Sequence, residues 1–433
     1  MSAEQEAAAS TATSRSYANY VLAILFVVYV FNFIDRQILG ILLDDIKADL
    51  GVSDSAMGFL VGFAFVLFYT VAGIPIARLA DRSSRRSIIA IGLTAWSALT
   101  AASGLAQNFF QLALARVGVG IGEAAGSPPA HSLLSDYFPP RRRATALAIY
   151  STGVYVGAMI AFVAGGYLKE LVGWRAAFFA VGLPGLLLAV LVRFTIAEPA
   201  RGLSENRTVD SGPVTMAEVL RYLLGCRSFM LMMVAASVQS LSGYSVLVWG
   251  PAYLGRVHGL NGVDIGLYLG VIIGVAGCLG GYLGGKFTDR MARRDVRWYL
   301  RLPALQSLLG VPFVIGFLLS EQWETALLHF IPFYFLGAMY VGPMLSMCQG
   351  LVKLRMRATA SALLLFVLNL IGLGLGPMLV GIMNDWFFDS LGNEAIRYSL
   401  LVMGIAGGSA SIVFWLASLS LREDLARAAE PDA

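Results

Sequence analysis

Four ionisable side chains lie inside long apolar stretches of the chain: Asp35, Arg36, Arg116 and Glu123. Each would cost roughly 2.5 to 3.5 kcal/mol at the centre of a hydrocarbon layer, so we expect them to face a cavity and one another. A static network of salt bridges is the alternative. However, buried ion pairs add little stability over apolar replacements, which favours a functional role for these four residues.

The pairing of acids with arginines indicates proton exchange and anion binding. Glu123 follows Arg116 by two helical turns, so both side chains lie on one helix face with Gly120 between them. Burial favours the protonated form of a carboxylate, whereas a nearby arginine favours the charged form. We therefore expect Asp35 and Glu123 to couple protons, and Arg36 and Arg116 to alternate between neutralising them and binding an anionic substrate group.

The depth of these residues can be counted along the chain. Asp35 lies fifteen residues beyond Tyr20, about 22 Å along a helix, whereas Arg116 lies seven residues beyond Phe109, about 10 Å from the opposite edge. In a hydrocarbon core of about 30 Å these two levels nearly coincide. The sequence therefore predicts a charge-assisted contact between Asp35 and Arg116.

The elements that position these residues are membrane-spanning helices. Of the 433 residues 58% are hydrophobic and 13% charged, and the mean hydropathy is +0.73, which leaves too little polar surface for a water-soluble protein. Long unbroken apolar runs favour helices over a barrel. We predict an all-α integral membrane protein with twelve transmembrane helices, near residues 18–43, 56–78, 87–106, 109–135, 144–168, 176–197, 228–254, 263–287, 299–320, 325–350, 358–386 and 395–420.

The distribution of charge predicts the orientation in the membrane. If the N-terminus is cytoplasmic, most of the 31 Lys and Arg residues fall at cytoplasmic ends and loops. The net charge of +4 is then a topology signal and implies no nucleic-acid partner. We expect a multi-pass protein of a bacterial inner or plasma membrane with both termini cytoplasmic. The first span is too long, and lacks the cleavage site, for a removable signal peptide.

Two repeats indicate a duplicated unit. The cassette ARLADRSSRR at 77–86 returns as GKFTDRMARR at 285–294, and RATALA from Arg143 returns as RATASA from Arg357. The polar stretch between the halves is expected to contain a short amphipathic helix, Met216 to Leu224, on the membrane surface. We predict a cytoplasmic tail (1–17), a six-helix bundle (18–198), a cytoplasmic linker (199–227), a second six-helix bundle (228–421) and a C-terminal tail (422–433).

The repeated cassettes have the composition of a gate. Asp81 and Asp289 lie at helix ends beside basic residues, where each could pair across the two bundles in one conformation only. Topology and solvated charge are the alternative explanation for much of this basic character. The expected gating partners are Arg82, Arg86, Arg143, Arg290, Arg294 and Arg357.

Several of these motifs resemble the major facilitator superfamily. They are the Asp-Arg-x-x-Arg-Arg loops, the glycines that follow Arg116, and the six-plus-six repeat. FNFIDRQILG on the first span and GWRAAFFAVGLPGLL into the sixth resemble the spinster branch, whose members move lysolipids. The resemblance implies the major facilitator fold, with two pseudo-symmetric bundles, and secondary active transport by alternating access.

The resemblance also implies which spans line a central cavity, namely the first, fourth, seventh and tenth. A charged cluster with aromatic and methionine walls suits an amphiphile better than a sugar, whose hydroxyls would need many polar partners. We therefore expect a lysolipid-like or other amphipathic anion, moved with protons. The expected wall residues are Asn32, Gln239, Ser240, Tyr244, Tyr334, Tyr340 and Met344, joined by Tyr150, Tyr155 and Asn369.

Other chemistries find little support in the sequence. The glycines from Gly120 to Gly126 follow no strand and precede no Lys-Ser/Thr, so they are not a phosphate-binding loop. The three histidines lack metal-ligand spacing. We expect no enzyme activity, no metal and no cofactor, and we expect a monomer whose partners are the lipid bilayer, the substrate and protons. A sugar or organic-acid transporter, or a non-transporting receptor or sensor, remains an alternative.

Overall fold

The computed structural model describes residues 14–199 and 215–429, except for a few side chains inside helices. Within these ranges helices are the only regular elements, which confirms the all-helical prediction. Eight helical runs of the described chain are long and apolar enough to cross a membrane. Ten of the twelve predicted spans fall in these runs, and the third and fourth correspond to the separate helices α5 (Arg85–Ser103), α6 (Phe109–Glu123) and α7 (Ser127–Tyr137).

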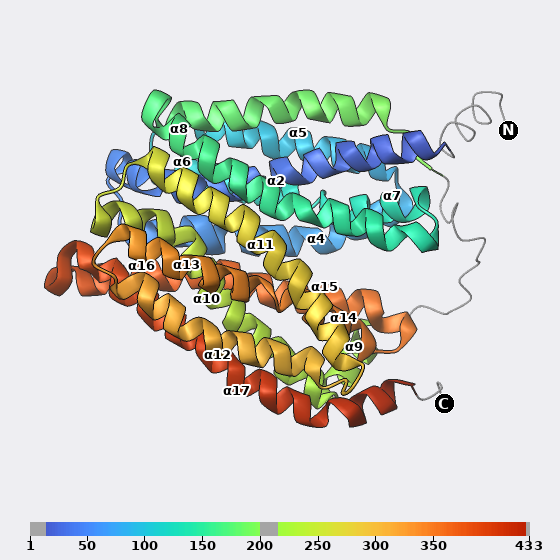
Figure 1. The fold of residues 1–433 in the computed structure, drawn as a ribbon. Helices are drawn as coiled ribbons and strands as arrows, with labels where there is room; N and C mark the ends of the chain where they lie inside the picture. Colours follow the sequence, from blue (N-terminus) through green and yellow to red (C-terminus); the bar gives the residue numbers. More distant parts are fainter. Residues whose placement is uncertain (1–13, 200–214, 430–433) are drawn as a thin grey trace. The chain divides into compact units, whose positions relative to one another are not determined.

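Two of the eight runs each contain two predicted spans. The helix α8 (Pro140–Thr195) includes Gly173 with φ of 78°, a left-handed conformation that glycine adopts without steric cost. Figure 1 shows the chain turning back there. Likewise α16 (Gly376–Leu391) and α17 (Ala395–Ala429) meet at Gly392, with φ of 55°. Helix α17 also extends through the segment expected to be a C-terminal tail, as far as Ala429.

The chain divides into two compact units, of which unit 1 comprises residues 1–52 and 64–209. Its helices are α2 (Arg15–Leu50), α4 (Phe65–Arg82), α5, α6, α7 and α8. Helix α8 packs along α2 and α5, and α6 packs against α5 and α4. Close helix contacts depend on small residues: a Cβ at Gly157 would lie 2.6 Å from the Val30 carbonyl oxygen on α2.

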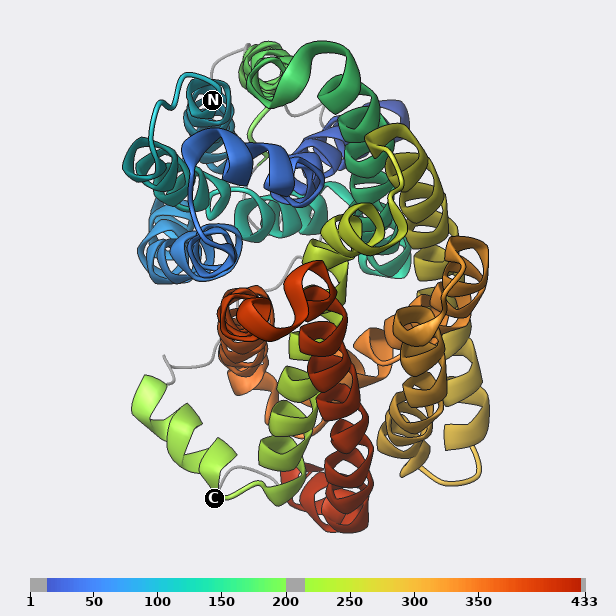
Figure 2. The same cartoon turned by 90° about the vertical axis from the view of Figure 1, so that its left-hand side faces the viewer.

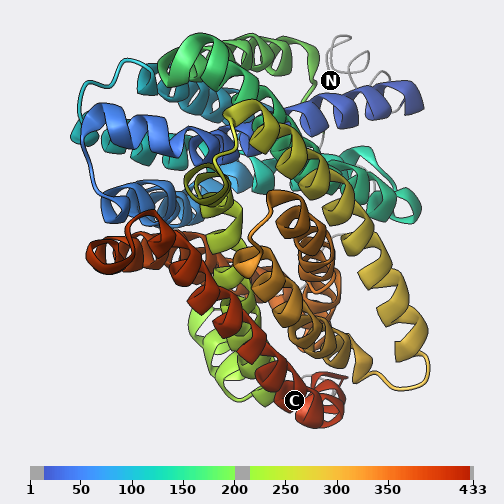
Figure 3. The same ribbon diagram turned by 60° about the vertical axis from the view of Figure 1, so that its left-hand side comes forward.

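Unit 2 comprises residues 53–63 and 210–433. Helix α17 packs on α10 (Arg227–His258) and α12 (Trp298–Leu319) around an apolar core. Figure 3 shows α11 (yellow) extending along unit 2 and joining α12 through a short loop. Unit 2 also contains α16 and the elements α9 (Met216–Leu224), α11 (Gly262–Ala292), α13 (Trp323–Ala338), α14 (Val341–Gly350), a 3-10 turn (Leu354–Met356), α15 (Arg357–Leu368), the π-helix η3 (Asn369–Leu375) and a 3-10 turn (Gly392–Glu394).

Residues 53–63 form the helix α3 (Asp54–Gly58) and most of the π-helix η1 (Phe59–Ala64), and they group with unit 2 although α2 and α4 flank them in sequence. A Cβ at Gly62 would lie 2.5 Å from the Gly374 carbonyl oxygen, so the two backbones are in direct contact. The Asp54 carboxylate accepts hydrogen bonds from Arg256 and Asn384. We call residues 53–63 the clasp segment.

Candidate functional site

The predicted contact between Asp35 and Arg116 is present inside unit 1. Arg116 Nη1 on α6 donates to Asp35 Oδ1 on α2 at 3.0 Å, and each residue is only 1% exposed. The Thr100 hydroxyl on α5 donates to the other carboxylate oxygen, Oδ2. Both oxygens of Asp35 are therefore held by partners, and the carboxylate bridges three helices. Thr100 was not predicted, because a threonine on an apolar span has the same signature as a packing residue.

A second ion pair lies next to the first. Arg36 Nε on α2 donates to Glu123 Oε2 on α6 at 2.6 Å, and the Glu123 side chain has no exposed surface. Among the described residues, Glu123 Oε1 is buried without a hydrogen-bond partner. The consecutive residues Asp35 and Arg36 of α2 thus pair with Arg116 and Glu123, which lie two helical turns apart on α6. The unpaired oxygen leaves room on this carboxyl for a proton.

Aromatic rings surround the two arginines. The Arg36 guanidinium carbon lies 4.6 Å from the ring centroid of Tyr69 and 5.1 Å from that of Phe33. The Arg116 guanidinium carbon lies 5.5 Å from the centroid of Phe65. Such contacts stabilise a cation in a low-dielectric setting without neutralising it. Phe65 and Tyr69, four residues apart on α4 and stacked at 5.7 Å, were not predicted.

The aromatic surface continues from Arg36 to a predicted wall residue. Phe33 packs edge-on against Tyr29, and Tyr29 stacks on Tyr150 of α8 with centroids 4.3 Å apart. His131 of α7 also packs edge-on with Tyr150, with ring centroids 5.2 Å apart. Tyr150 therefore belongs to the neighbourhood of the charged cluster. Tyr29 and His131 join it as residues that sequence spacing alone did not connect to this cluster.

The polar residues predicted on α10 lie in unit 2, in neutral surroundings. Gln239 and Ser240 are buried, and Gln239 lines a hollow of about 10 Å³ together with Gln306 and Ser307 of α12. Within the described residues, Oε1 of Gln239 and Oε1 of Gln306 are both buried without hydrogen-bond partners. Ser242 also lines this hollow. We call it the glutamine hollow; it is just large enough for one water molecule.

The other predicted wall residues lie in different settings. Asn32 is buried in α2, whereas Tyr155, Tyr244 and Tyr334 are half-buried. Tyr340 and Met344 pack in the apolar core of unit 2, where their surroundings are those of packing residues. Asn369 begins the π-helix η3, and its Nδ2 donates to the Leu365 carbonyl at 2.9 Å.

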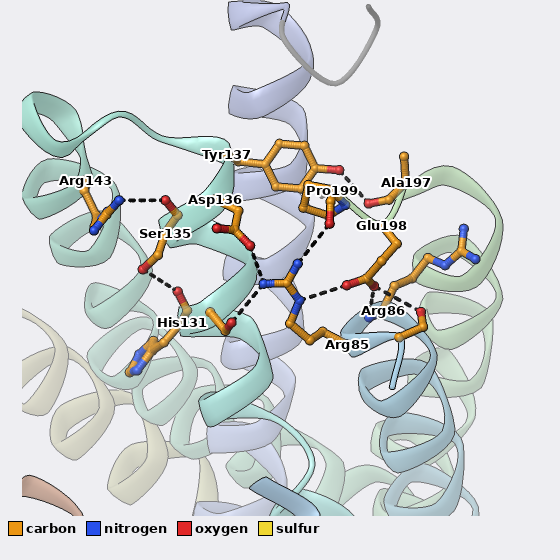
Figure 4. Close-up of polar contacts among 12 residues, drawn as sticks. Arg85, Arg86, His131, Ser135, Asp136, Tyr137, Arg143, Ala197, Glu198 and Pro199 are labelled. Atoms are coloured by element: carbon orange, nitrogen blue, oxygen red, sulfur yellow. Dashed lines mark hydrogen bonds and ion pairs between the residues drawn. The ribbon is translucent and has the colours of Figure 1, made fainter. Parts of the chain in front are cut away.

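The predicted gating residues are described only within each unit. Asp81 lies in α4, but its side chain is outside the described residues, and Arg82 is exposed. Arg143 donates to the Ser135 carbonyl at 3.0 Å (Figure 4). Asp289 accepts a hydrogen bond from Tyr299 at 2.9 Å. The remaining members, Arg290, Arg294 and Arg357, are exposed, and the latch between bundles stays a prediction.

The first cassette contains a further network that was not predicted. Arg85 is only 1% exposed, and its guanidinium donates to Glu198 at 2.8 Å, to Ser132 at 2.9 Å and to Asp136 (Figure 4). Its Nη2 also donates to the Pro199 carbonyl at 3.1 Å. Arg85 thereby ties the start of α5 to α7 and to the chain beyond α8. More than a hundred residues separate Arg85 from Glu198, so local spacing carried no signal of this contact.

Glu198 is the acceptor that organises this network. Burial raises the pKa of its carboxyl, but hydrogen bonds from the Arg86 backbone N–H, the Arg85 guanidinium and the Ser84 hydroxyl outweigh burial and hold the pKa below its ordinary value. Arg86 Nη1 also donates to the Ile196 carbonyl at 3.0 Å. Arg86, predicted as a gating residue, therefore anchors the start of α5 to the end of α8.

Comparison with known proteins adds evidence of kinship. Residues 25–377 match the Major Facilitator Superfamily. A protein named "MFS-type efflux pump" from Mycolicibacterium smegmatis is 34% identical over 93% of this chain and 93% of its own length. "Protein spinster homolog 1" from Xenopus tropicalis is 26% identical over 98% of this chain and 85% of its own length.

Solved structures show the same similarity in three dimensions. A bacterial homologue of the human lysosomal transporter Spinster, crystallised in an inward-facing and unoccupied conformation, has a TM-score of 0.87 and 30% identity, and the match covers 95% of this chain and 99% of that one. A D-xylose-proton symporter has a TM-score of 0.75 at 16% identity, covering 93% and 98%, and shares the fold.

Proposed function

This chain belongs to the major facilitator superfamily and is a spinster-like secondary transporter, and we propose that it couples protons to the movement of an amphipathic anion. Membership of this family also favours a transporter over the receptor or sensor considered from sequence. We propose that residues 18–198 and 228–421 are the two bundles that move against each other, and that the protein works as a monomer in a bacterial inner membrane with both termini cytoplasmic.

One observation carries the proposal: two ion pairs lie buried side by side, and one of the four carboxylate oxygens has no partner among the described residues. In our proposal, an anionic headgroup takes the place of Glu123 on Arg36. The released carboxylate, still buried, then binds a proton, because desolvation disfavours its charged form. Departure of the anion reverses both steps. Proton binding and substrate binding are thereby linked through one arginine.

Asp35 has a different part in this proposal. Its two oxygens already accept hydrogen bonds from Arg116 and Thr100. Protonation of Asp35 would weaken the bond to Arg116 and so free a second cation for the substrate. We propose that Asp35 couples protons through Arg116, while Glu123 couples them through Arg36.

The surroundings of the arginines support an amphiphile as substrate. Aromatic rings from α2, α4 and α8 lie around or beside Arg36, and they offer apolar contact next to a cation. A lysolipid combines an anionic headgroup with an acyl chain, which fits this combination. We propose that Asn32, Tyr150, Tyr155, Gln239, Ser240, Tyr244, Tyr334 and Asn369 contribute to the walls, and that Tyr340 and Met344 support them by packing.

The clasp segment adds to the proposed gating. The Arg256 side chain of α10 and Asp385 of α16 both hold the start of α3. Since the clasp segment continues directly into α4 of unit 1, we propose that its contacts with unit 2 break and re-form as the transporter alternates between conformations. We propose that it acts together with the cassette residues Asp81 and Asp289, at opposite ends of the helices.

A competition experiment tests the substrate class. Purified protein in detergent is heated with lysophosphatidylglycerol, with galactonate, or with neither, and the unfolding temperature is measured. We expect lysophosphatidylglycerol to raise that temperature and Arg36→Gln to abolish the shift. A shift with galactonate but none with the lysolipid would contradict the proposal.

An organic-acid carrier is the second candidate, because two buried arginines also suit a small carboxylate. The "Probable L-galactonate transporter" of Escherichia coli is 28% identical over 57% of this chain. The same competition decides between the two, and uptake into vesicles by the protein then confirms transport of the ligand that stabilises it.

A further inference from the structure

The short helix α9 lies at one end of the membrane-spanning helix α10. It has the bounds predicted from sequence, and it begins with a capping box in which Thr215 and Glu218 exchange hydrogen bonds. The chain passes from its last residue, Leu224, to the first residue of α10, Arg227, in two residues. Figure 2 shows α9 (lime green, lower left) at the outside of unit 2, beside α10.

Helix α9 has two adjoining apolar flanks with different exposure. Val219 and Leu223 are buried, 0% and 3% exposed, in the core of unit 2. Met216, Leu220 and Leu224 are 46%, 43% and 68% exposed. Because these three follow one another at intervals of four residues, they form a single stripe along the helix. We call it the α9 stripe; among the described residues nothing buries it.

The surroundings of the stripe are basic. Arg221 and Arg227 are exposed, and Arg427 Nη2 donates to the Gly225 carbonyl at the end of α9 at 2.8 Å. The nearby acids are engaged locally: Glu218 caps its own helix, and Asp424 accepts the Ser228 backbone N–H at 2.7 Å. An apolar stripe flanked by arginines at the end of a spanning helix matches the boundary between headgroups and acyl chains of an anionic leaflet.

We propose that α9 is an anionic-lipid site. The α9 stripe enters the leaflet next to the start of α10, and Arg221 and Arg227 bind the phosphate of an acidic phospholipid. The adjoining buried flank, Val219 and Leu223, fixes α9 to the core of unit 2 and so sets its depth. This site depends on the chain being membrane-embedded, and it is independent of proton coupling and of the transported substrate.

Depth measurement by spin labelling tests the position of the stripe. Cys278 is replaced by alanine because it is partly exposed and could take up the label. Cys226 and Cys348 are fully buried and are kept. Labels are attached at Leu220→Cys or, as the matched control, at Glu218→Cys on the opposite face. The Glu218→Cys variant keeps the Thr215 cap bond that uses its backbone N–H. In nanodiscs we expect the Leu220 label to be accessible to oxygen and shielded from a nickel chelate, and the Glu218 label to show the reverse.

Lipid dependence tests the charge. We expect phosphatidylglycerol to stabilise the purified protein against heat more than phosphatidylcholine does. The double variant Arg221→Gln with Arg227→Gln should lose at least half of this difference, whereas Arg293→Gln with Arg294→Gln, at the end of α11, should keep it. A Leu220 label shielded from both relaxants would mean that protein covers the stripe. Three outcomes would overturn the proposal: this shielding of the Leu220 label from both relaxants, access of the nickel chelate to the Leu220 label, and equal losses in the two double variants.

Discussion

The two units bury different polar groups at their centres. Unit 1 holds the pairs Asp35–Arg116 and Arg36–Glu123, all charged. The glutamine hollow of unit 2 is lined instead by neutral amides and hydroxyls. Unit 2 also contains an ion pair with a buried acid, Asp54–Arg256. This pair lies at helix ends, because Asp54 begins α3 and Arg256 is in the last turn of α10.

Both units are helical, but they differ in the polar chemistry that they bury. A neutral amide can hold a water molecule or a hydroxyl, but it cannot exchange a proton at neutral pH. A carboxylate paired with an arginine can do so when a competing anion arrives. We therefore propose that proton and anion chemistry belongs to unit 1 and that unit 2 has a supporting polar role.

The largest predicted effect is a loss of unfolding free energy that is greater for a substitution in unit 1 than for one in unit 2. Asp35→Ala leaves Arg116 buried without its partner and should cost about 3 to 5 kcal/mol of unfolding free energy. Gln306→Ala in the glutamine hollow removes neutral hydrogen bonds to the Pro303 carbonyl and the Ser307 hydroxyl and should cost about 1 kcal/mol. Thermal unfolding of the purified variants measures both changes.

A matched double variant controls this comparison. Asp35→Leu with Arg116→Met removes both charges and should recover most of the loss, because apolar residues of similar volume replace buried ion pairs at little cost. If Asp35→Ala lowers the unfolding free energy no more than Gln306→Ala does, the charged centre of unit 1 is not energetically distinct from the hollow of unit 2.

A smaller effect concerns the Arg85 network and its response to pH. Since the pKa of Glu198 is below its ordinary value of 4.5, this carboxyl stabilises the folded state above that value, and the contribution is lost as the pH falls through the lowered pKa. Glu198→Gln should cost about 1 to 2 kcal/mol at neutral pH. The difference from wild type should shrink once the pH falls below 4.5, as followed by unfolding across a pH series.

Arg86→Gln is a control in this series, because the variant keeps the hydrogen bond from the backbone N–H of residue 86 to Glu198. We expect its stability to depend on pH as the wild type does. If the unfolding free energies of Glu198→Gln and wild type differ by the same amount at every pH, Glu198 is not the titrating group.

The smallest effect concerns the glutamine hollow. A Cβ at Gly337 meets nothing within 4 Å, so Gly337→Ala should raise the unfolding free energy by about 0.4 to 1 kcal/mol through reduced backbone entropy. Gly404→Ala, also on the hollow, is the control: its Cβ would lie 2.8 Å from Val314 Cγ2, and the variant should be destabilised. Equal effects at both positions would argue against an open hollow beside Gly337.

Part of this account could be predicted from the chain alone. Counting residues from the ends of two apolar runs placed Asp35 and Arg116 at one level, because the rise of a helix and the thickness of a bilayer are fixed quantities. The bounds of α9 followed from the amphipathic pattern within the polar stretch between the halves, and the structure confirms them. The family followed from motifs spread over both halves, and the comparisons confirm it.

Other features required the fold. Thr100 and Tyr69 are uncharged residues on apolar spans, where the same residue types also serve as packing, so only proximity to Asp35 and Arg36 distinguishes them. Arg85 and Glu198 meet because α8 turns back at Gly173, which spacing does not encode. The clasp segment belongs by sequence to the first half, yet its glycines pack against the backbone of unit 2.

We propose that protons couple to transport through the carboxylates of unit 1. The most direct test is uptake of the stabilising ligand into proteoliposomes, measured with and without an imposed pH gradient, for wild type, Asp35→Asn, Glu123→Gln and, as a control in the glutamine hollow, Gln306→Leu. We expect wild type and Gln306→Leu to accumulate the ligand with the gradient, whereas Glu123→Gln and Asp35→Asn exchange it without accumulation. Gradient-driven accumulation that persists in both carboxylate variants would contradict the account.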